Sequence, residues 1–379
     1  MTTRCSLTTP RIDSEGCRPN TPIQNPHPLG GCIRPTYGPM TQENTTLITG
    51  GAGFIGSHLA ERLVHSGRRV RLVDNLSTGR RSNVAGLLDD PTGRCTLIEA
   101  DALDAADDPA VWAGVDQVFH LAASVGVQRV IDDPAAMMRN NVLTTDAVLR
   151  AAGRASASVL IASSSEVYGR CPVLPLTEDA ELVYGPTTAS RWSYGMAKAL
   201  DEHLALDLAN RTGLKAVVVR LFNTIGPRQV GHYGMVVPRF VDQAIRGETL
   251  TVYGDGKQTR AFCDVRDVTD ALARLLEVPE AVGGVFNVGA THAVTIGELA
   301  SGVLRAAGAP ADRVQHIPYE EVFGAGFEDP HDRLPSVDRL DRIIGGFRPT
   351  WTLDATLDEL VSLARDNASN PPAPPEHAA

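Results

Sequence analysis

The stretch that decides the fold is TTLITGGAGFIGSHLAERLVHSG, which runs from Thr45 to Gly67. A β-branched apolar run comes first, a glycine turn follows, and apolar residues then recur at helical spacing. Gly50, Gly53 and Gly56 form the pattern GxxGxxG, which lets a backbone turn tightly and approach a diphosphate. The unpaired N–H groups at a helix start favour such a ligand. The stretch therefore predicts a dinucleotide-binding strand, turn and helix.

The next predicted strand, RRVRLVD, ends in Asp74. A carboxylate at this place accepts hydrogen bonds from both ribose hydroxyls and repels a 2′-phosphate, which favours NAD over NADP. Arg80 and Arg81 lie close enough in the sequence to act in the opposite sense. Asp101, at the end of CTLIEAD, is a candidate partner for the adenine amino group, and a strand-end cap is the alternative interpretation.

Short β-branched runs alternate with helical patterns from residue 45 onward. Continuous apolar strands separated by helices are typical of a parallel sheet covered on both faces. The sequence thus predicts an α/β fold with a doubly wound parallel sheet. The predicted strands are 45–50, 68–75, 95–101, 117–123, 158–164, 216–223 and 284–289, and the predicted helices are Ile55–Ser66, Met137–Arg154 and Tyr194–Arg211.

The composition changes at Gly226, where Gly- and Pro-rich loops become frequent. We expect residues 45–225 to form the dinucleotide-binding domain, with later segments returning to it. Residues 226–365 are expected to form mainly a smaller substrate-binding lobe. Residues 1–44 are rich in Pro, Gly, Thr and Asn without periodicity, so they are predicted to be disordered, and residues 366–379 are predicted to be a short disordered tail.

The charge balance limits the partners. The 379 residues carry a net charge of −10 and contain no basic tract, so nucleic acid and anionic membrane surfaces are not expected partners. No apolar run reaches the roughly 18 residues of a membrane span. Six cysteines are scattered without a CxxC pattern, which argues against a disulfide framework and against a metal site, and the cytoplasm is the expected compartment.

A row of polar residues follows the predicted strand SVLIASS. It reads SSSEVYG, from Ser163 to Gly169, and places hydroxyls and the Glu166 carboxylate at a strand end. Further on, Tyr194 and Lys198 are four residues apart in a helical pattern and therefore share a face. A lysine ammonium near a phenol favours the phenolate, and such a tyrosine can take a proton from a sugar hydroxyl while hydride leaves the adjoining carbon. His120, in HLAA, is more simply explained as a packed core histidine than as a catalyst.

Together these motifs resemble the extended short-chain dehydrogenase/reductases that act on nucleotide sugars. The resemblance rests on TGGAGFIG, Asp74, HLAA, SSSEVYG, YxxxK, RLFNTIGPRQ and YGDGKQTRAFCDVRDV, and it covers about residues 45–365. It implies a Rossmann-type domain that holds NAD, a C-terminal lobe for the UDP-sugar, and a homodimer formed through a helical bundle.

The resemblance also implies roles for individual residues. Ser164, Tyr194 and Lys198 would form the catalytic triad, with Ser165 and Glu166 beside them. Asn223 and Arg260 would contact the substrate's diphosphate. The residues expected to line the NAD site are Gly50, Gly53, Phe54, Ile55, Gly56, Asp74, Asn75, Asp101, Ala102, Leu121, Ala122, Ala123, Asn141, Ser163, Tyr194 and Lys198.

The pair after Ser164 distinguishes the reactions of this family, which all begin by oxidation at the sugar's C4. Family 4,6-dehydratases carry Asp-Glu there, whereas this chain has Ser165-Glu166, and a hydroxyl is a poor acid for expelling water. Family UDP-glucuronate decarboxylases carry Ser-Glu or Cys-Glu. They also show an Arg-Trp pair before the tyrosine, here Arg191-Trp192, and an arginine in a segment like DRLPSV, here Arg333, which would help fix the substrate's carboxylate or diphosphate.

The resemblance therefore favours oxidation of UDP-glucuronate at C4 followed by decarboxylation to a UDP-4-keto-pentose or UDP-xylose. A UDP-sugar 4-epimerase acting on UDP-glucuronate or on UDP-glucose is the alternative, because Arg333 could bind the diphosphate alone. The segment before it, GFEDPHD, also lacks the basic run typical of xylose synthases. A non-catalytic NAD-binding protein is the alternative from another class, and it would require a broken triad, whereas Ser164, Tyr194 and Lys198 are all present.

Overall fold

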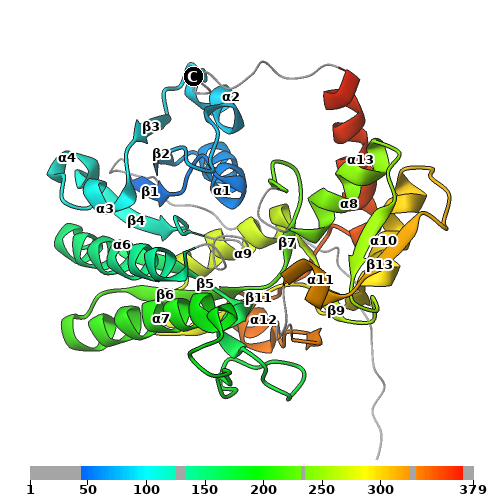
Figure 1. Cartoon of the computed structure of the whole chain (residues 1–379). Coiled ribbons are helices and arrows are strands. Elements are labelled where there is room, and N and C mark those ends of the chain that lie inside the picture. The colour runs from blue at the N-terminus through cyan, green and yellow to red at the C-terminus, as the bar shows by residue number, and fades with distance from the viewer. Residues whose placement is uncertain (1–43, 125–132, 232–234, 324–329, 370–379) are drawn as a thin grey trace, which may run out of the picture. The chain divides into compact units, whose positions relative to one another are not determined.

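A seven-stranded parallel sheet forms the centre of the chain in the computed structural model, which describes residues 44–124, 133–231, 235–323 and 330–369 (Figure 1). The strand order is β11-β6-β5-β4-β1-β2-β3. The strands are β1 (Thr45–Thr49), β2 (Arg69–Asp74), β3 (Cys95–Glu99), β4 (Val115–His120), β5 (Ser158–Ser164), β6 (Ala216–Leu221) and β11 (Val285–Val288). This arrangement confirms the predicted α/β class and each predicted strand.

The strand order reverses beside β1. The chain first adds β2 and β3 on one side of β1 and then returns to place β4 on the other side. In open parallel sheets the crevice at such a switch point, beyond the carboxyl ends of the strands, is where ligands bind. The glycine turn and HLAA follow β1 and β4, so both lie at this crevice.

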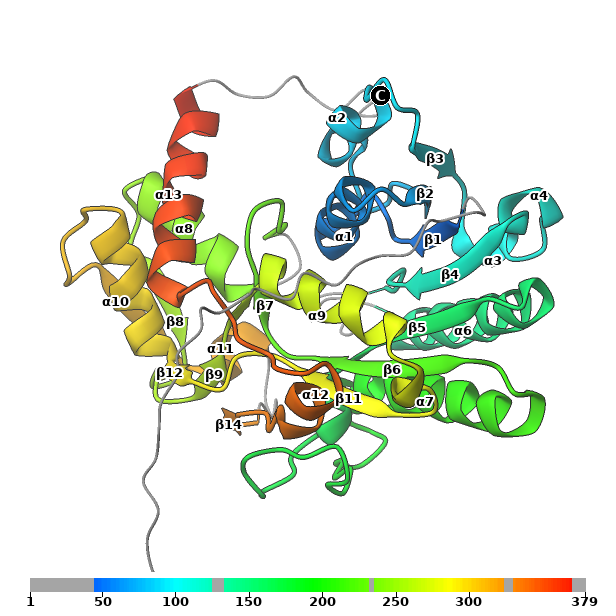
Figure 2. The same ribbon diagram turned by 180° about the vertical axis from the view of Figure 1, so that it is seen from behind.

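Helices cover both faces of the sheet because neighbouring residues of each strand point to opposite sides. Leu47 packs with α6 (Pro134–Ala155) and α7 (Ser193–Thr212), whereas Ile48 packs with α1 (Phe54–His65) and α9 (Val265–Glu277). Figures 1 and 2 show these two pairs of helices on opposite faces of the sheet. With both faces buried, the strands are apolar throughout, which explains the runs seen in the sequence.

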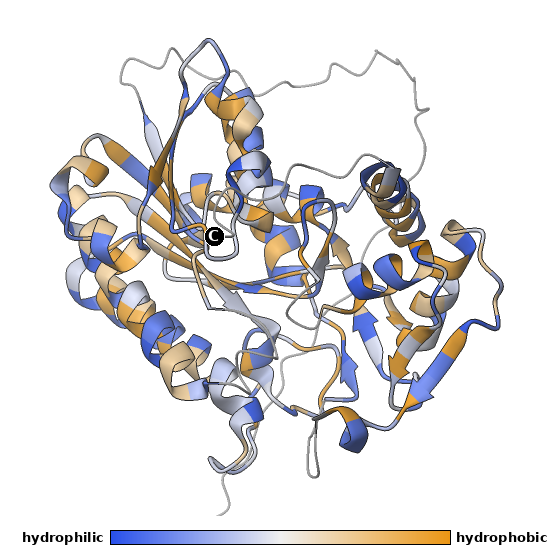
Figure 3. Ribbon diagram, turned by 45° about the horizontal axis from the view of Figure 1, so that its top comes forward, coloured by the Kyte–Doolittle hydropathy of each residue, from blue (hydrophilic) through white to orange (hydrophobic). Residues whose placement is uncertain are grey.

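A third hydrophobic cluster forms the core of a smaller lobe. It joins α8 (Val236–Ile245), β8 (Leu250–Tyr253), α10 (Ile296–Ala306) and α13 (Leu353–Ser369), and β13 (Val314–Ile317) pairs with β8. Figure 3 shows hydrophilic residues along one side of α13 and hydrophobic residues along the other. α9 and β11 follow residue 226 in the chain, but α9 packs on the large sheet and β11 is one of its strands.

The remaining elements are short. They are η1 (Arg81–Asn83), α2 (Ala85–Leu88), α3 (Ala102–Ala105), α4 (Pro109–Trp112), η2 (Ser165–Tyr168), η3 (Ser190–Trp192), β7 (Thr224–Ile225), β9 (Thr259–Ala261), β10 (Cys263–Asp264), η4 (Pro279–Ala281), β12 (Ala293–Thr295), α11 (Tyr319–Phe323), β14 (Asp332–Arg333) and α12 (Asp338–Ile343).

The predicted C-terminal tail is partly wrong, because α13 continues to Ser369. The Ser369 hydroxyl donates to the Arg365 carbonyl, and the Arg365 guanidinium donates to the Ala307 carbonyl, so the last turn is held by both local and tertiary bonds. The rest of that tail and residues 1–43 lie outside the described residues. Within the described ranges, no helix is both long and apolar enough to cross a membrane.

Candidate active site

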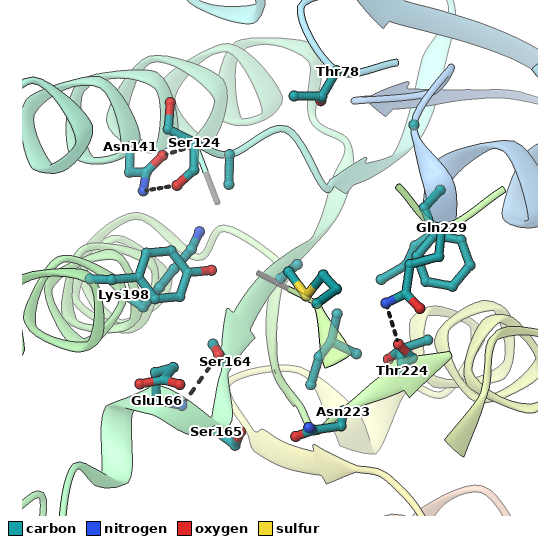
Figure 4. A pocket seen from close by; sticks show the side chains of 18 of the residues that line it. Thr78, Ser124, Asn141, Ser164, Ser165, Glu166, Lys198, Asn223, Thr224 and Gln229 are labelled. Atoms are coloured by element: carbon teal, nitrogen blue, oxygen red, sulfur yellow. Dashed lines mark hydrogen bonds between the residues drawn. The ribbon is translucent and has the colours of Figure 1, made fainter. Parts of the chain in front are cut away.

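One large pocket, with a volume of about 1210 Å³, lies at the switch point and extends into the smaller lobe. Every residue that the sequence predicted for the cofactor, for catalysis or for the substrate lines this pocket. In Figure 4, Ser164, Glu166 and Lys198 lie on one side of it, and Thr224 and Gln229 lie on the opposite side. A single pocket of this size has room for a dinucleotide and a second ligand together.

The glycine turn forms a bare backbone cradle. Gly50 has a φ of +71°, and a Cβ there would lie 2.9 Å from the Ala122 nitrogen. A Cβ on Gly56 would lie 2.2 Å from the Gly50 carbonyl oxygen, so helix and turn touch without side chains between them. Gly53 precedes the first residue of α1, Phe54, and offers no capping side chain. The N–H groups of this first helical turn therefore remain available for a diphosphate.

We expect Gly56→Ala to lose NAD and to destabilise the chain by about 1–3 kcal/mol, because the added methyl must displace backbone atoms. The measurements are the NAD content of the purified protein and its melting temperature. Gly86→Ala in α2 is the matched control, since a Cβ there meets nothing within 4 Å. Full NAD content in Gly56→Ala would show that the cradle does not hold the diphosphate.

Asp74 lines the pocket next to the glycine turn. Its carboxylate accepts hydrogen bonds from the backbone nitrogens of Ala52 at 2.9 Å and Leu76 at 2.8 Å, which fixes its position beside the turn. Burial raises the pKa of this carboxyl, and the backbone bonds oppose that change. Asp101 is the N-cap of α3 and also accepts from Asn75 Nδ2 at 2.9 Å. The capping interpretation of Asp101 is thus confirmed, while Asp101 still lines the pocket.

Polar residues of α6 and of the chain at the end of β4 form the pocket wall next to the glycine turn. Asn141 accepts from the Ser124 nitrogen at 2.7 Å and donates to the Ser124 carbonyl at 3.2 Å, so it fixes the chain after HLAA rather than projecting alone (Figure 4). His120 bonds Thr49 Oγ1 at 2.7 Å and Thr145 Oγ1 at 3.2 Å inside the core. Burial, assisted by Lys198, lowers the pKa of His120 to about 3. Its burial and its two threonine partners confirm it as a packed core histidine.

Tyr194 and Lys198 lie on the pocket face of α7, as their spacing predicts. The sequence predicts that Lys198 lowers the pKa of Tyr194, but in the folded chain the pKa of Tyr194 is raised. Burial of the phenol raises its pKa, and the ammonium of Lys198 together with a hydrogen bond to Ser164 opposes this only in part. Lys198 is buried and forms an ion pair with Asp201, a residue that the sequence reading did not single out.

The three serines of SSSEVYG have different surroundings. The Ser163 hydroxyl donates to Glu202 at 2.5 Å, and Glu202 forms a buried two-bond pair with Arg220. Ser163 therefore belongs to a buried network that joins β5, α7 and β6, although it lines the pocket. Ser164 accepts from the Glu166 nitrogen at 3.2 Å and bonds Tyr194, and Ser165 is buried at the pocket wall.

Two arginines hold the Glu166 carboxylate. Arg191 donates at 2.5 and 3.1 Å, and Arg333 donates at 2.6 Å to Oε1. Burial alone would raise the pKa of this carboxyl, but Arg333 and Arg191 outweigh burial and hold the pKa well below its usual range. The Nε and Nη2 atoms of Arg333 are buried and have no hydrogen-bond partner among the described residues. The trio thus carries a net charge of +1, and all three of its residues line the pocket.

Three more residues that line the pocket are candidates for binding a nucleotide. Arg260 lines the pocket, but its guanidinium donates to the carbonyls of Thr259, His331 and Pro330 at 2.7–3.0 Å, so part of its capacity stabilises the chain around β14. Asn223 lies at the pocket wall in Figure 4. Arg239 was missed by the sequence reading. It lines the pocket 3.9 Å from the centroid of the Tyr253 ring, and only its place in the segment VVPRF could have suggested it.

The strand order, the glycine cradle, Asp74 and the Ser-Tyr-Lys group define an NAD-dependent short-chain dehydrogenase/reductase of the extended class. The model of the NAD-dependent epimerase/dehydratase family matches residues 46–289, and the chain belongs to this family. The predictions of fold, family and NAD as the cofactor are thereby confirmed.

Curated relatives include several decarboxylases. The chain is 38% identical to the UDP-N-acetyl-alpha-D-glucosaminuronate decarboxylase of Bacillus cytotoxicus, over 84% of this chain and 97% of that protein. It is 34% identical to UDP-glucuronic acid decarboxylase 1 of Arabidopsis thaliana, over 86% of this chain and 70% of that protein. Among solved structures, the UDP-glucuronic acid 4-epimerase of Bacillus cereus matches with a TM-score of 0.75 at 26% identity, covering 85% of this chain and 99% of that one.

Proposed function

We propose that the chain is an NAD-dependent decarboxylase of a UDP-linked uronic acid, with UDP-glucuronate as the first candidate substrate. The observation that carries this proposal is the Arg191–Glu166–Arg333 trio, where two guanidinium groups at the pocket wall share one carboxylate and leave one positive charge without a counter-ion in the trio. Arginine forks match carboxylates, and an uncompensated positive charge in a chain of net charge −10 favours an anionic ligand. The decarboxylases among the relatives support the same reaction.

The residues fit the chemistry that C4 oxidation needs. Tyr194 would take the proton of the C4 hydroxyl, Ser164 would bond the same oxygen, and Lys198 would stabilise the phenolate. Bound NAD⁺ would accept the hydride from C4 and add a positive charge beside the phenol. The glycine cradle, Asp74 and Asn75 would hold it, and the bare backbone of the cradle fits a diphosphate. Asn223, Arg260 and Arg191 would bind the substrate.

Loss of CO₂ follows from the position of the new ketone. The C4 ketone makes the C6 carboxylate a β-keto acid, so the C5–C6 bond breaks, its electron pair forms the C4–C5 enolate, and C5 is then protonated. The protein has to hold the carboxylate and the sugar ring while this happens. Arg333 would hold the carboxylate, and Ser165 would line the space beside it.

Glu166 would act as a carboxylate and not as a proton donor. Its pKa in the folded chain is lowered by the two arginines, so the group is charged at any pH above that lowered value. The stabilisation from the trio is complete above the ordinary pKa of a glutamic acid and is lost only as the pH falls through the lowered pKa. Substrate binding at this trio is therefore expected to be insensitive to pH between about 5 and 9.

The experiment that tests the proposal is incubation of the chain with NAD⁺ and UDP-glucuronate or UDP-N-acetylglucosaminuronate. Release of CO₂ with a UDP-linked pentose or its 4-keto form supports decarboxylation. Formation of UDP-galacturonate supports the second candidate, a UDP-sugar 4-epimerase, which the similarity to the Bacillus cereus UDP-glucuronic acid 4-epimerase favours. The absence of a product from either UDP-uronate and from UDP-glucose would favour a non-catalytic NAD-binding protein.

We expect Glu166→Gln to slow CO₂ release by about 100-fold, because it removes the charge that sets both guanidinium groups in place. NAD content should be unchanged. The matched control is Glu181→Gln, an exposed carboxylate in the segment that follows η2. Unchanged CO₂ release in Glu166→Gln would remove the trio from the mechanism and with it the main argument for a decarboxylase.

We also propose a homodimer through α6 and α7, which pack side by side and expose Leu143 and Leu200 at 49% and 46%. The resemblance to the family supports this arrangement, and a light-scattering mass twice the 40.4 kDa of one chain would test it.

The cytoplasm is the proposed compartment, because the described cysteines Cys95, Cys171 and Cys263 are free thiols. We propose no metal, since no group of His, Cys, Asp or Glu in the described ranges could hold one.

A further inference from the structure

Lysine is rare in this chain, and one of its few lysines is buried in the pocket wall. There are three lysines against 32 arginines. Lys215 and Lys257 are exposed, whereas Lys198 is 3% exposed. An arginine keeps its charge when it is buried, but a lysine readily becomes a neutral amine. The charge of Lys198 therefore depends on what surrounds it.

The Asp201 carboxylate lies directly against this lysine. Lys198 Nζ is 3.1 Å from Asp201 Oδ2, both residues are on the same turn of α7, and the Asp201 side chain is 0% exposed. Burial raises the pKa of the Asp201 carboxyl, and the ammonium of Lys198 together with a hydrogen bond from Thr145 opposes that change. Burial by itself lowers the pKa of Lys198, but Asp201, Tyr194 and Glu202 outweigh burial and raise the pKa above its ordinary value.

The other ionisable groups near this pair leave no second carboxylate for Lys198. They are Glu202 from α7, which pairs with Arg220, Glu166 from η2, which pairs with Arg191 and Arg333, and His120 from β4, which is neutral. From α6, the uncharged hydroxyl of Thr145 faces Asp201. Asp201 is therefore the carboxylate left to balance the ammonium of Lys198.

We propose that Asp201 is a positioning residue whose carboxylate keeps Lys198 a charged ammonium and fixes it beside Tyr194. The inference rests on the proposed role of Lys198 in stabilising the Tyr194 phenolate, and it names a residue that acts on the base only through that lysine. Without the carboxylate, burial would favour the neutral amine, and a neutral amine cannot stabilise a phenolate by charge.

The scarcity of lysine makes a direct measurement possible. The full chain, loaded with NAD and labelled with ¹³C at the lysine Cε, has three lysine signals, and those of Lys215 and Lys257 serve as exposed references. We expect Lys198 to remain an ammonium up to pH 10 in the wild type. In Asp201→Asn its titration midpoint should fall by about 3 pH units. A neutral Lys198 in the wild type at pH 8, or the same midpoint in both proteins, would overturn the proposal.

The pH dependence of turnover is the second readout. Because a lysine is charged only below its midpoint, kcat of Asp201→Asn should fall about tenfold for each pH unit above that midpoint, while wild-type kcat stays level. Asp207→Asn, an exposed carboxylate of α7 that pairs with Arg211, is the matched control. A lower melting temperature with an unchanged pH profile would mean a purely structural role for Asp201, and would overturn the proposal.

Two additions to the experiment distinguish a failure of the variant to fold, or of the proposed function, from a failure of this proposal. If Asp201→Asn does not fold, Asp201→Ser removes the same charge with a smaller side chain. If the wild type turns over no UDP-uronate, the proposed function fails. The lysine titration still decides on Asp201 in that case, because it needs no substrate.

Discussion

Tyr194→Phe should abolish turnover, with a loss of about 10³-fold or more, while NAD remains bound. The change removes the phenol oxygen that would take the proton from the C4 hydroxyl, and it leaves the buried ring in place. The measurements are product formation from UDP-glucuronate, NADH absorbance in a single turnover, and NAD content. The hydride cannot leave C4 unless the proton does, so both product and NADH should be missing.

Tyr184→Phe is the matched control for this prediction. Tyr184 also belongs to the loop region around the site, and its hydroxyl donates to the Gly195 carbonyl at 3.2 Å, but it does not line the pocket. Its loss should change turnover only slightly. Normal NADH formation in Tyr194→Phe would show that another group takes the proton.

Arg333→Ala should reduce kcat/KM for UDP-glucuronate by about 10²- to 10³-fold, because it removes the buried partner of Glu166 and the guanidinium that would hold the substrate's carboxylate. Binding of UDP-glucose, which has no carboxylate, should weaken far less. Steady-state kinetics with the uronate and the dissociation constant of UDP-glucose measure the two effects. Their ratio is the decisive quantity.

The control for Arg333→Ala is Arg342→Ala, an exposed arginine of α12. Equal losses for the two ligands in Arg333→Ala would show that Arg333 binds only the diphosphate. The argument for a carboxylate site would then be lost, and the 4-epimerase of a neutral UDP-hexose would become the better candidate.

Local patterns predicted the cofactor half of the site. The glycine turn, β1 and α1 are contiguous in the chain, so their residue spacing alone determines the cradle. Tyr194 and Lys198 share one helix, so their common face was predictable too. The direction of the Tyr194 pKa was not, because it depends on how deeply the fold buries the phenol.

The ion pairs of the site that could not be predicted from the sequence depend on long-range contacts. Arg333 reaches Glu166 across 167 residues because β14 pairs with β9 and carries it to the pocket. The resemblance named both residues for the site, but no spacing indicates that they form an ion pair. Asp201 was missed for a related reason: a carboxylate three residues after a lysine looks like a surface pair until the packing of α6 against α7 buries it.

The Ser163–Glu202–Arg220 network has a consequence for how the molecule moves. It ties the end of β5 to the middle of α7 and to β6 through buried charged hydrogen bonds, so the serine row and the Tyr-Lys helix cannot separate without breaking it. Amide hydrogens of β5 and of α7 around Glu202 should therefore exchange with solvent at one common, slow rate, set by opening of the whole sheet. Substrate entry would then have to be accommodated by the smaller lobe.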